Sequence, residues 1–341
     1  MESSEKNVTQ NDVAKEAGVT RSMVSYVISG SKGRSVAPET RQRILEAIDR
    51  LGYRPNKAAQ ALQQGRDIFV QKQIGIVLCN ADVFRRPYYA EIIQGIYTAA
   101  HENKYHIHFI RFFDELKDPV LFNELIHSEE IGGLIMISTD LCIKNRQDEE
   151  IIERIKERIK KIVCVEWKGP GLCSIIFDRQ DSAKKAADHL FLKGYNSIAY
   201  IGQNDDRIMG VKQSMLEHNL EPQSLYTAPA FTMSAGYSAI KEMRKKSLLP
   251  RAIICGSDEV AIGALCFLNE EKISVPDSVA LISIDNIETS GYTNPPLTTM
   301  NVQKSAMGER AVEMIVNGTA NQEQGAVCIS LPTNLVIRQS C

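Results

Sequence analysis

Several polar and aromatic side chains stand directly after short apolar runs in this 341-residue chain. Asp285 follows the run 280–284, and Arg207 follows the run 198–201 after a polar loop. Carboxylates and a guanidinium supply the acceptors and donors that hydroxyl groups need, and aromatic faces cover the C–H surface of a sugar. An arginine also suits a carboxylate ligand. We therefore predict a polyol or sugar site. Its candidate residues are Asn80, Tyr88, Tyr89, Asp178, Arg207, Phe231, Ser257, Asp258 and Asp285.

Some of these side chains also have a simpler interpretation. An aspartate at the end of a strand often caps the following helix, and this applies to Asp178 and Asp258. Tyr88 and Tyr89 could be ordinary core residues, with only one of them facing a ligand. Arg207 is the candidate that such structural roles explain least.

Apolar segments that alternate between strand-like and helix-like lengths must position these residues. The alternation predicts parallel sheets that are covered by helices on both faces. The number of segments is about twice what one open sheet usually holds, so we expect two doubly wound subdomains with the ligand at the carboxyl ends of their strands. The predicted strands are 74–78, 107–112, 133–137, 162–165, 174–177, 198–201, 252–255 and 280–284, and the predicted helices are 92–100, 121–126, 151–159, 182–192, 208–218, 261–268 and 304–316.

The segment 8–28 has a different pattern. Thr9, followed three residues later by Asp12, predicts a capped first helix that ends at Gly18, and Thr20 begins a second helix. Two short helices joined by such a tight turn are typical of the helix-turn-helix motif, whose second helix fits the major groove of DNA. The segment therefore predicts a DNA-reading head.

The next residues support that interpretation. Pro38 begins a third helix, which Gly52 ends, and its apolar side chains complete a small core. The Ala-rich segment 57–64 after Pro55 is too short and too weakly apolar to form a stable helix alone. We interpret it as a hinge helix that orders when DNA binds. The base-facing candidates on the second helix are Arg21, Ser22 and Tyr26.

A resemblance to a known family rests on two runs of sequence, DVAKEAGVTRSMVSYVISG and ETRQRILEAIDRLGYRPNKAAQAL. In this order and spacing they resemble the lactose/galactose repressor family of bacterial transcriptional regulators. The resemblance extends over nearly the whole chain and implies a periplasmic-binding-protein-like core, a homodimer and double-stranded operator DNA as partner. It also implies that a hinge leucine, matched by Leu62, wedges between base steps in the minor groove. The DNA-contacting residues indicated by the pattern and the resemblance are Thr9, Thr20, Arg21, Ser22, Ser25, Tyr26, Asn56, Ala59 and Leu62.

The resemblance also implies roles in the core. An arginine three residues before a glycine holds the effector in the family, and Arg207 matches it. Asp285 matches a ligand-binding aspartate, and Phe231 matches an aromatic residue that covers the ligand. Ser257 stands where an asparagine is common, which leaves fewer hydrogen bonds for the ligand. The loop 30–35 is also longer than is usual in the family.

The domain organisation follows from these patterns. We expect a helix-turn-helix DNA-binding domain at 1–54, a hinge helix and linker at 55–73, and an effector-binding and dimerisation core at 74–341. Within the core we expect a first subdomain at about 74–177 plus 300–320 and a second at about 178–290 plus 325–341.

Composition narrows the class of protein further. The first 65 residues hold ten Lys or Arg against seven Asp or Glu, whereas the whole chain has a net charge of -2, so the head is basic and the core acidic. The eight cysteines form no CxxC pair and predict reduced, buried thiols. No apolar stretch approaches the roughly 20 residues of a membrane span, and the N-terminus lacks a secretion signal. We expect a cytoplasmic protein that makes no membrane contact.

These features favour one function and leave alternatives open. We predict a transcriptional repressor of carbohydrate-utilisation genes, whose operator affinity is controlled by a sugar or phosphosugar in the cleft between the subdomains. The alternatives are a regulator that responds to a corepressor or a protein partner, and a solute-binding α/β protein. An enzyme is disfavoured because no P-loop, GxSxG or Rossmann glycine motif occurs. His106 and His108 share a strand face without a cysteine or carboxylate cluster, so we predict no metal and no other cofactor.

Overall fold

The computed structural model describes residues 8–29, 36–53 and 72–341. Three helices form the head, α1 (Gln10–Ala17), α2 (Arg21–Ser29) and α3 (Pro38–Leu51). Thr9 caps α1, because its hydroxyl accepts from Asp12 N at 3.3 Å while the Asp12 carboxylate accepts from Thr9 N at 2.8 Å. Gly18 ends α1 in the left-handed conformation, with φ 66°. The predicted capping box and tight turn are confirmed.

A small apolar core holds these three helices together. Val13 of α1, Val24 of α2 and Ile44 of α3 are fully buried, and Tyr53 closes the cluster after Gly52. Pro38 begins α3 and Gly52 ends it, as predicted. The core fixes the orientation of α2, so the side chains of its opposite face are left for solvent or a partner.

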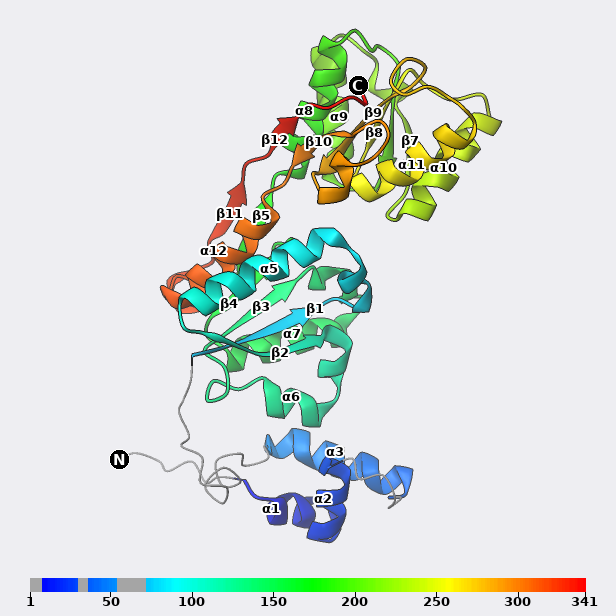
Figure 1. The fold of residues 1–341 in the computed structure, drawn as a ribbon. Helices are drawn as coiled ribbons and strands as arrows, with labels where there is room; N and C mark the ends of the chain where they lie inside the picture. Colours follow the sequence, from blue (N-terminus) through cyan, green and yellow to red (C-terminus); the bar gives the residue numbers. More distant parts are fainter. Residues whose placement is uncertain (1–7, 30–35, 54–71) are drawn as a thin grey trace. The chain divides into compact units, whose positions relative to one another are not determined.

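The first sheet of the core has the strand order β11-β5-β4-β3-β1-β2. The pairs that join β5, β4, β3, β1 and β2 are all parallel. Apolar side chains of α6 and α7 pack against one face, while α5 and α12 lie on the other (Figure 1). The strands are β1 (Gln73–Leu78), β2 (His106–Phe112), β3 (Gly133–Ile137), β4 (Ile162–Val165), β5 (Cys173–Phe177) and β11 (Cys328–Leu331), and the helices are α5 (Pro87–Glu102), α6 (Pro119–Leu125), α7 (Arg146–Arg158) and α12 (Lys304–Val316).

The second sheet has the order β12-β10-β9-β8-β6-β7, with β12 antiparallel to β10 and the other pairs parallel. The α10 and α11 helices bury an apolar cluster against one face, and α8 contacts the strands from the other side together with its neighbour α9. The strands are β6 (Ile198–Gly202), β7 (Tyr226–Pro229), β8 (Ala252–Cys255), β9 (Ala280–Asp285), β10 (Thr298–Asn301) and β12 (Asn334–Val336), and the helices are α8 (Arg179–Leu192), α9 (Asp206–Glu217), α10 (Met233–Lys245) and α11 (Asp258–Glu270).

Short 3₁₀ helices connect several of these elements. They are η1 (Ala81–Arg85), η2 (Phe113–Lys117), η3 (Thr139–Cys142), η4 (Pro222–Ser224), η5 (Glu288–Gly291) and η6 (Gln322–Gln324). Each strand and helix predicted from the alternation has a counterpart, but the alternation predicted neither α10 nor the strands β7, β10, β11 and β12. The predicted hinge helix at 57–64 lies outside the described residues. The β7 segment is only four residues long and alternates in burial, so it lacks the continuous apolar run of the central strands.

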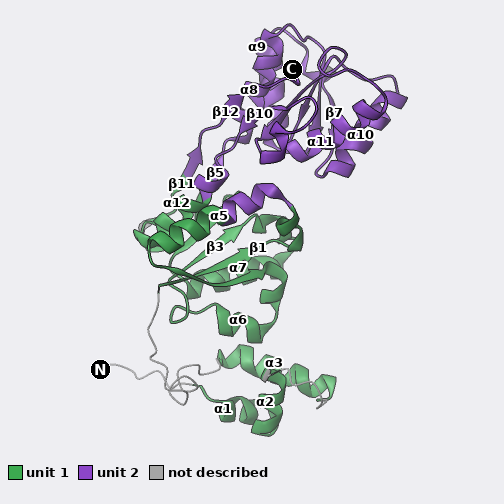
Figure 2. Ribbon diagram, viewed as in Figure 1, with its two compact units in different colours: residues 1–85, 94–175, 308–328 green, residues 86–93, 176–307, 329–341 purple. Residues whose placement is uncertain are grey.

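The chain divides into two compact units, residues 1–85, 94–175 and 308–328 in the first and 86–93, 176–307 and 329–341 in the second (Figure 2). The division differs from the predicted boundaries at 300–307, which the prediction assigns to the first subdomain, and at 325–328, which it assigns to the second. The physical reason is that β10 pairs with β9 and β12, and this pairing keeps the residues up to Met307 with the second sheet. The first turn of α5 also belongs to the second unit.

All eight cysteines are free thiols. Five of them are buried and Cys142 is half-buried, but Cys266 on α11 and Cys328 at the start of β11 are exposed, so the prediction of buried thiols was wrong for these two. No helix in the described part of the chain is long and apolar enough to cross a membrane.

Candidate functional site

The exposed face of α2 carries the predicted base-reading side chains. Arg21 and Ser22 are exposed in its first turn, and Ser25 and Tyr26 are half-buried one turn later. Thr20 precedes the helix, and its hydroxyl accepts from Met23 N at 3.4 Å. Such a cap leaves the first turn of α2 open to a phosphate or a base edge. The other predicted DNA contacts are the exposed Thr9 of the α1 cap and the residues Asn56, Ala59 and Leu62, of which the last three lie outside the described residues.

The second unit gathers most of the predicted effector residues near the carboxyl ends of β6, β8 and β9. Two glycines make this edge possible, because a Cβ at Gly202 or Gly256 would lie 2.5 or 2.6 Å from the Tyr200 hydroxyl. Tyr200 is fully buried and donates to the Gln203 carbonyl at 3.1 Å. Burial raises the pKa of Tyr200, so its hydroxyl stays protonated at neutral pH. Through this hydrogen bond, the buried Tyr200 of β6 holds the loop that leads to α9.

Arg207 lies in the first turn of α9 and is only 7% exposed. Its Nη1 pairs with the carboxylate of Asp205, which also caps the helix by accepting from Arg207 N at 3.1 Å. The guanidinium lies 5.6 Å from the centroid of the Phe177 ring. The buried Nε atom has no hydrogen-bond partner among the described residues. Buried donors without a partner are rare in folded proteins, so this atom indicates a place for a ligand.

Asp285 ends β9 and is almost completely buried. Its backbone has φ 128°, a conformation that L-residues rarely adopt, which persists only where the surroundings impose it and is common in binding sites. Burial and the nearby Asp258 carboxyl raise its pKa well above the ordinary value, while Arg207, Lys304 and Arg86 oppose the shift. Within the described part of the chain, no donor bonds to its carboxyl group. Asp285 therefore offers acceptor sites in a place where water is scarce.

Asp258 is also buried, but its hydrogen bonds are complete. Its carboxylate accepts from the Ser283 hydroxyl at 2.5 Å, the Thr299 hydroxyl at 2.6 Å and Ile287 N at 2.7 Å. These bonds join α11 to β9 and β10. Burial raises the pKa of Asp258, and the three hydrogen bonds counteract that shift. These three bonds give Asp258 a structural role that accounts for its burial, and its predicted effector contact stays a prediction.

Three further predicted residues cap helices or turns. Asp178 is exposed and caps α8 by accepting from Asp181 N at 2.9 Å, and Ser257 caps α11 by accepting from Val260 N at 3.3 Å. Asn80, in the first unit, follows β1 and accepts from Asp82 N at 3.0 Å. Each keeps some exposure, so their effector contacts stay predictions.

Phe231 lies in the short loop between β7 and α10 and is 38% exposed. The Arg86 guanidinium covers it, with its central carbon 4.0 Å from the ring centroid and 5.3 Å from that of Tyr89. Arg86 Nε donates to Glu259 Oε2 at 2.7 Å, and both side chains are nearly buried. Tyr88 and Tyr89 are buried and make an edge-to-face pair at 5.3 Å, so both belong to the core of this region.

Sequence reasoning missed Arg86, Glu259 and Lys304. They come from the residue before α5, the first turn of α11 and the first residue of α12. One signal was present, because Arg86 and Lys304 both stand at the beginning of a helix, where the helix dipole disfavours a cation. A positive charge in that position indicates that a carboxylate or carbonyl group elsewhere in the fold pairs with it.

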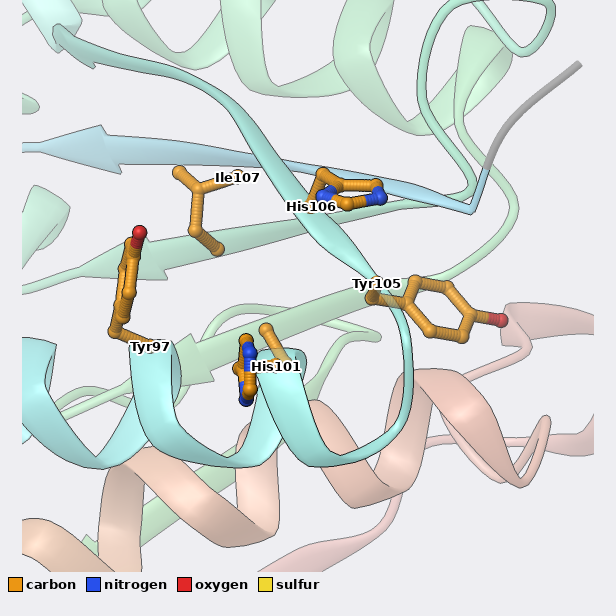
Figure 3. Close-up of a pocket in the computed structure, with 6 residues that line it drawn as sticks. Tyr97, His101, Tyr105, His106 and Ile107 are labelled. Carbon is orange, nitrogen blue, oxygen red and sulfur yellow. The ribbon is translucent and has the colours of Figure 1, made fainter. Parts of the chain in front are cut away.

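A separate surface pocket of about 140 Å³ lies in the first unit, between α5 and β2 (Figure 3). Its walls are Tyr97, Ala100, His101, Tyr105, His106 and Ile107. Tyr97 and His101 come from the helix and His106 and Ile107 from the strand, which is the edge strand of the first sheet. None of the predicted effector residues lines it.

Comparison with known proteins agrees with this arrangement of a head and a core. The family described as "Bacterial regulatory proteins, lacI family" matches residues 9–56, and the "Periplasmic binding protein-like domain" matches residues 187–341. A curated relative, the HTH-type transcriptional repressor PurR of Mannheimia succiniciproducens, is 28% identical over an alignment of 344 positions that covers 97% of this chain and 98% of the relative. These matches support assignment of the chain to the lacI family.

Solved structures of the lacI family share the fold. The Lac repressor dimer bound to operator and the anti-inducer ONPF superposes with a TM-score of 0.67 at 22% identity, over 98% of this chain and 99% of that one. A complex of the regulator CelR with cellobiose gives a TM-score of 0.66 at 21% identity, over 98% and 100% of the two chains. The predicted fold class and family are confirmed. The chain is a DNA-binding transcriptional regulator with a ligand-binding core, and its curated relative is a transcriptional repressor.

Proposed function

We propose that this regulator represses carbohydrate-utilisation genes and that a sugar or phosphosugar held by Arg207 and Asp285 controls its affinity for operator DNA. The observation that carries the proposal is the pair of unused polar groups at this site. Arg207 Nε is a buried donor without a partner among the described residues. Asp285 is 3% exposed, and no described residue donates a hydrogen bond to its carboxyl group.

A hydroxyl group suits such a pair because it accepts and donates at once. One hydroxyl of a sugar accepts from Arg207 Nε while a neighbouring hydroxyl donates to Asp285. Phe231 adds an exposed aromatic ring that covers C–H groups of a sugar. The cellobiose bound by the structural neighbour CelR supports a carbohydrate as the ligand class.

The head acts on DNA as part of a homodimer in this proposal. One head presents only the short α2 helix, so two heads related by a two-fold axis double the contacts and read a pseudo-palindromic operator. The dimeric Lac repressor on its operator is a precedent among the structural neighbours. The exposed Arg21 and Ser22 read bases or phosphates, and the segment that contains Asn56, Ala59 and Leu62 adds contacts in the minor groove.

Control follows from a shift between two states of the core. A sugar that binds one state better than the other raises the population of that state, and the two states differ in how well they hold the two heads on DNA. We propose that the sugar acts as an inducer, which lowers operator affinity. A protein partner or a corepressor would act on the same equilibrium with a different ligand.

The test is a thermal-shift screen of the full-length protein with neutral sugars, phosphosugars and, as a control class, amino acids and nucleobases. A ligand at about 100 times its Kd adds roughly 2.7 kcal/mol to the stability of the native state, which corresponds to several degrees in Tm. We expect a shift with at least one sugar and a loss of operator binding by the same sugar. Shifts confined to the control classes would overturn the assignment of a carbohydrate effector.

A further inference from the structure

Lys304 occupies an unusual position for a lysine. It is the first residue of α12, where the helix dipole disfavours a positive charge, and it is only 2% exposed. Burying an ammonium group costs several kcal/mol unless hydrogen bonds and charges replace its hydration. The burial of Lys304 therefore requires specific partners.

The partners of the Lys304 ammonium are backbone carbonyls. It donates to the Asp285 carbonyl at 2.6 Å, to the Asn286 carbonyl at 3.2 Å and to the Val302 carbonyl at 3.3 Å. Its charge is paired with the Glu91 carboxylate, 3.3 Å away. One side chain thus connects Glu91 of α5, the turn at the end of β9 and Val302, which lies two residues before Lys304.

The carbonyls that it binds belong to a strained turn. Asp285 has φ 128° and Asn286 has φ 55°, so two consecutive residues other than glycine adopt positive φ. Asparagine tolerates the left-handed region, but φ 128° at an aspartate is rare and persists only where the surroundings impose it. Asn286 is held by its side chain as well, since its Oδ1 accepts from Arg338 Nη2 at 2.7 Å and its Nδ2 donates to Asn301 at 3.0 Å.

We propose that Lys304 is a positioning residue of the effector site, whose ammonium holds the turn at Asp285 and Asn286 and thereby presents the Asp285 carboxyl to the ligand. The inference rests on the proposed function in one respect, since it takes Asp285 as an effector ligand. The residue acts on the ligand only through the backbone and charge of Asp285.

The same ammonium contributes to the charge balance of Asp285. The groups that act on this carboxyl are Asp258 of α11, Arg207 of α9, Arg86 before α5 and Lys304 itself. The charge of Asp285 also acts on Tyr200 of β6, whose pKa it raises. Burial and Asp258 raise the pKa of Asp285, and Lys304 is one of three cations that lower it. Removal of Lys304 therefore raises the pKa of Asp285 further.

The decisive experiment measures amide hydrogen exchange in the turn and the titration of the Asp285 carboxyl, both in the full-length protein without any effector. Lys304→Met keeps the length of the side chain and removes the charge and its three donated bonds. We expect amide hydrogen exchange in a peptide that covers the turn to accelerate by about tenfold. In aspartate-labelled protein, we expect the ¹³C resonance that Asp285→Asn removes to titrate on the order of one pH unit higher than in the wild type.

Lys160→Met is the matched control, because Lys160 is exposed and pairs with Glu323 at 2.9 Å. It should change neither measurement. A Lys304→Met protein with wild-type exchange in the turn and an unchanged Asp285 titration would overturn the proposal. Neither readout uses a sugar, so a failure of carbohydrate binding in the wild type would count against the proposed function alone.

A second variant covers the case in which Lys304→Met does not fold. Lys304→Gln carries no charge, but its amide can still donate to carbonyls of the turn. The proposal predicts exchange close to that of the wild type and a raised Asp285 pKa. An Asp285 titration that matches the wild type in Lys304→Gln would contradict the role of the ammonium charge.

Discussion

Two buried aspartates of the second unit have opposite surroundings. Asp258, at the start of α11, accepts three short hydrogen bonds that join its helix to β9 and β10. Asp285, at the end of β9, is just as inaccessible, yet no described residue donates to its carboxyl group, and its backbone is strained. The Asp258 carboxyl stabilises the fold, whereas the Asp285 carboxyl is left without a donor from the described chain, and we propose that a ligand supplies one.

The contrast shows how a binding residue differs from a structural one when both are buried, acidic and placed after a strand. A satisfied network rigidifies the protein, and an unsatisfied group costs stability unless a ligand completes it. Arg207 follows the same rule as Asp285, because one side of its guanidinium is paired with Asp205 and its buried Nε is not. The predictions below test this contrast.

The largest effect is expected from Asp258→Ala. The change removes the acceptor of Ser283, Thr299 and Ile287 N and leaves buried donors without partners. We expect the free energy of unfolding to fall by about 3 kcal/mol or more, measured by urea denaturation of the full-length protein. Asp285→Asn is the comparison variant and should lose little or no stability. Equal losses in the two variants would remove the distinction between them.

Arg207→Met should have the next largest effect, and on ligand binding rather than on folding. The variant keeps the apolar packing of the side chain but removes the free Nε and the charge. We expect affinity for the sugar identified in the screen to fall by about 100-fold, since hydrogen bonds to charged groups contribute roughly 1.5–3 kcal/mol each. Calorimetric titration measures the change. Wild-type affinity in this variant would exclude Arg207 from the site.

Arg21→Ala tests whether the head is independent of the effector residues. Arg21 is exposed at the start of α2, so its removal should disturb neither folding nor sugar binding. We expect operator affinity to fall by about tenfold, because a base or phosphate contact contributes roughly 1–3 kcal/mol. Fluorescence anisotropy with the selected operator, at fixed salt concentration, gives the value. A parallel loss of sugar affinity would show that the two regions are not separable in this way.

The last prediction is a pH dependence of stability that Asp285 causes. Its pKa is raised in the folded state, so the folded protein retains the proton longer than the unfolded chain does. The wild type therefore loses stability relative to Asp285→Asn as pH rises above about 3.9, by up to roughly 1.4 kcal/mol per unit, until the folded carboxyl ionises.

Urea denaturation of both proteins at about pH 4 and at about pH 7 measures this difference. A difference between the two proteins that does not change with pH would show that the Asp285 carboxyl titrates like an ordinary surface aspartate.

Much of this fold could be predicted from local signals. The box of Thr9 and Asp12, the left-handed Gly18 and the apolar runs of the central strands act over a few residues, and these elements lie where the patterns place them. The division of the chain was harder, because whether β10 pairs with β9 or begins the first subdomain depends on contacts between distant segments.

The candidate site divides in the same manner. Arg207 and Asp285 follow strands and were found by position, but a sequence does not reveal that Asp258 already holds three donors. Arg86 and Lys304 reach the site from helix starts, and only an unfavourable charge at a helix N-terminus marks them. The completeness of a hydrogen-bond network is a property of the folded chain.

Calorimetric titration tests the proposal that the unused groups of Arg207 and Asp285 form the effector site. The full-length wild type, Arg207→Met and Asp285→Asn are titrated in the calorimeter with the sugar that gives the largest thermal shift. We expect saturable binding to the wild type and an affinity for the sugar that is about 100-fold lower in both variants, while all three proteins remain folded. Undiminished binding of that sugar to either variant would contradict the proposal.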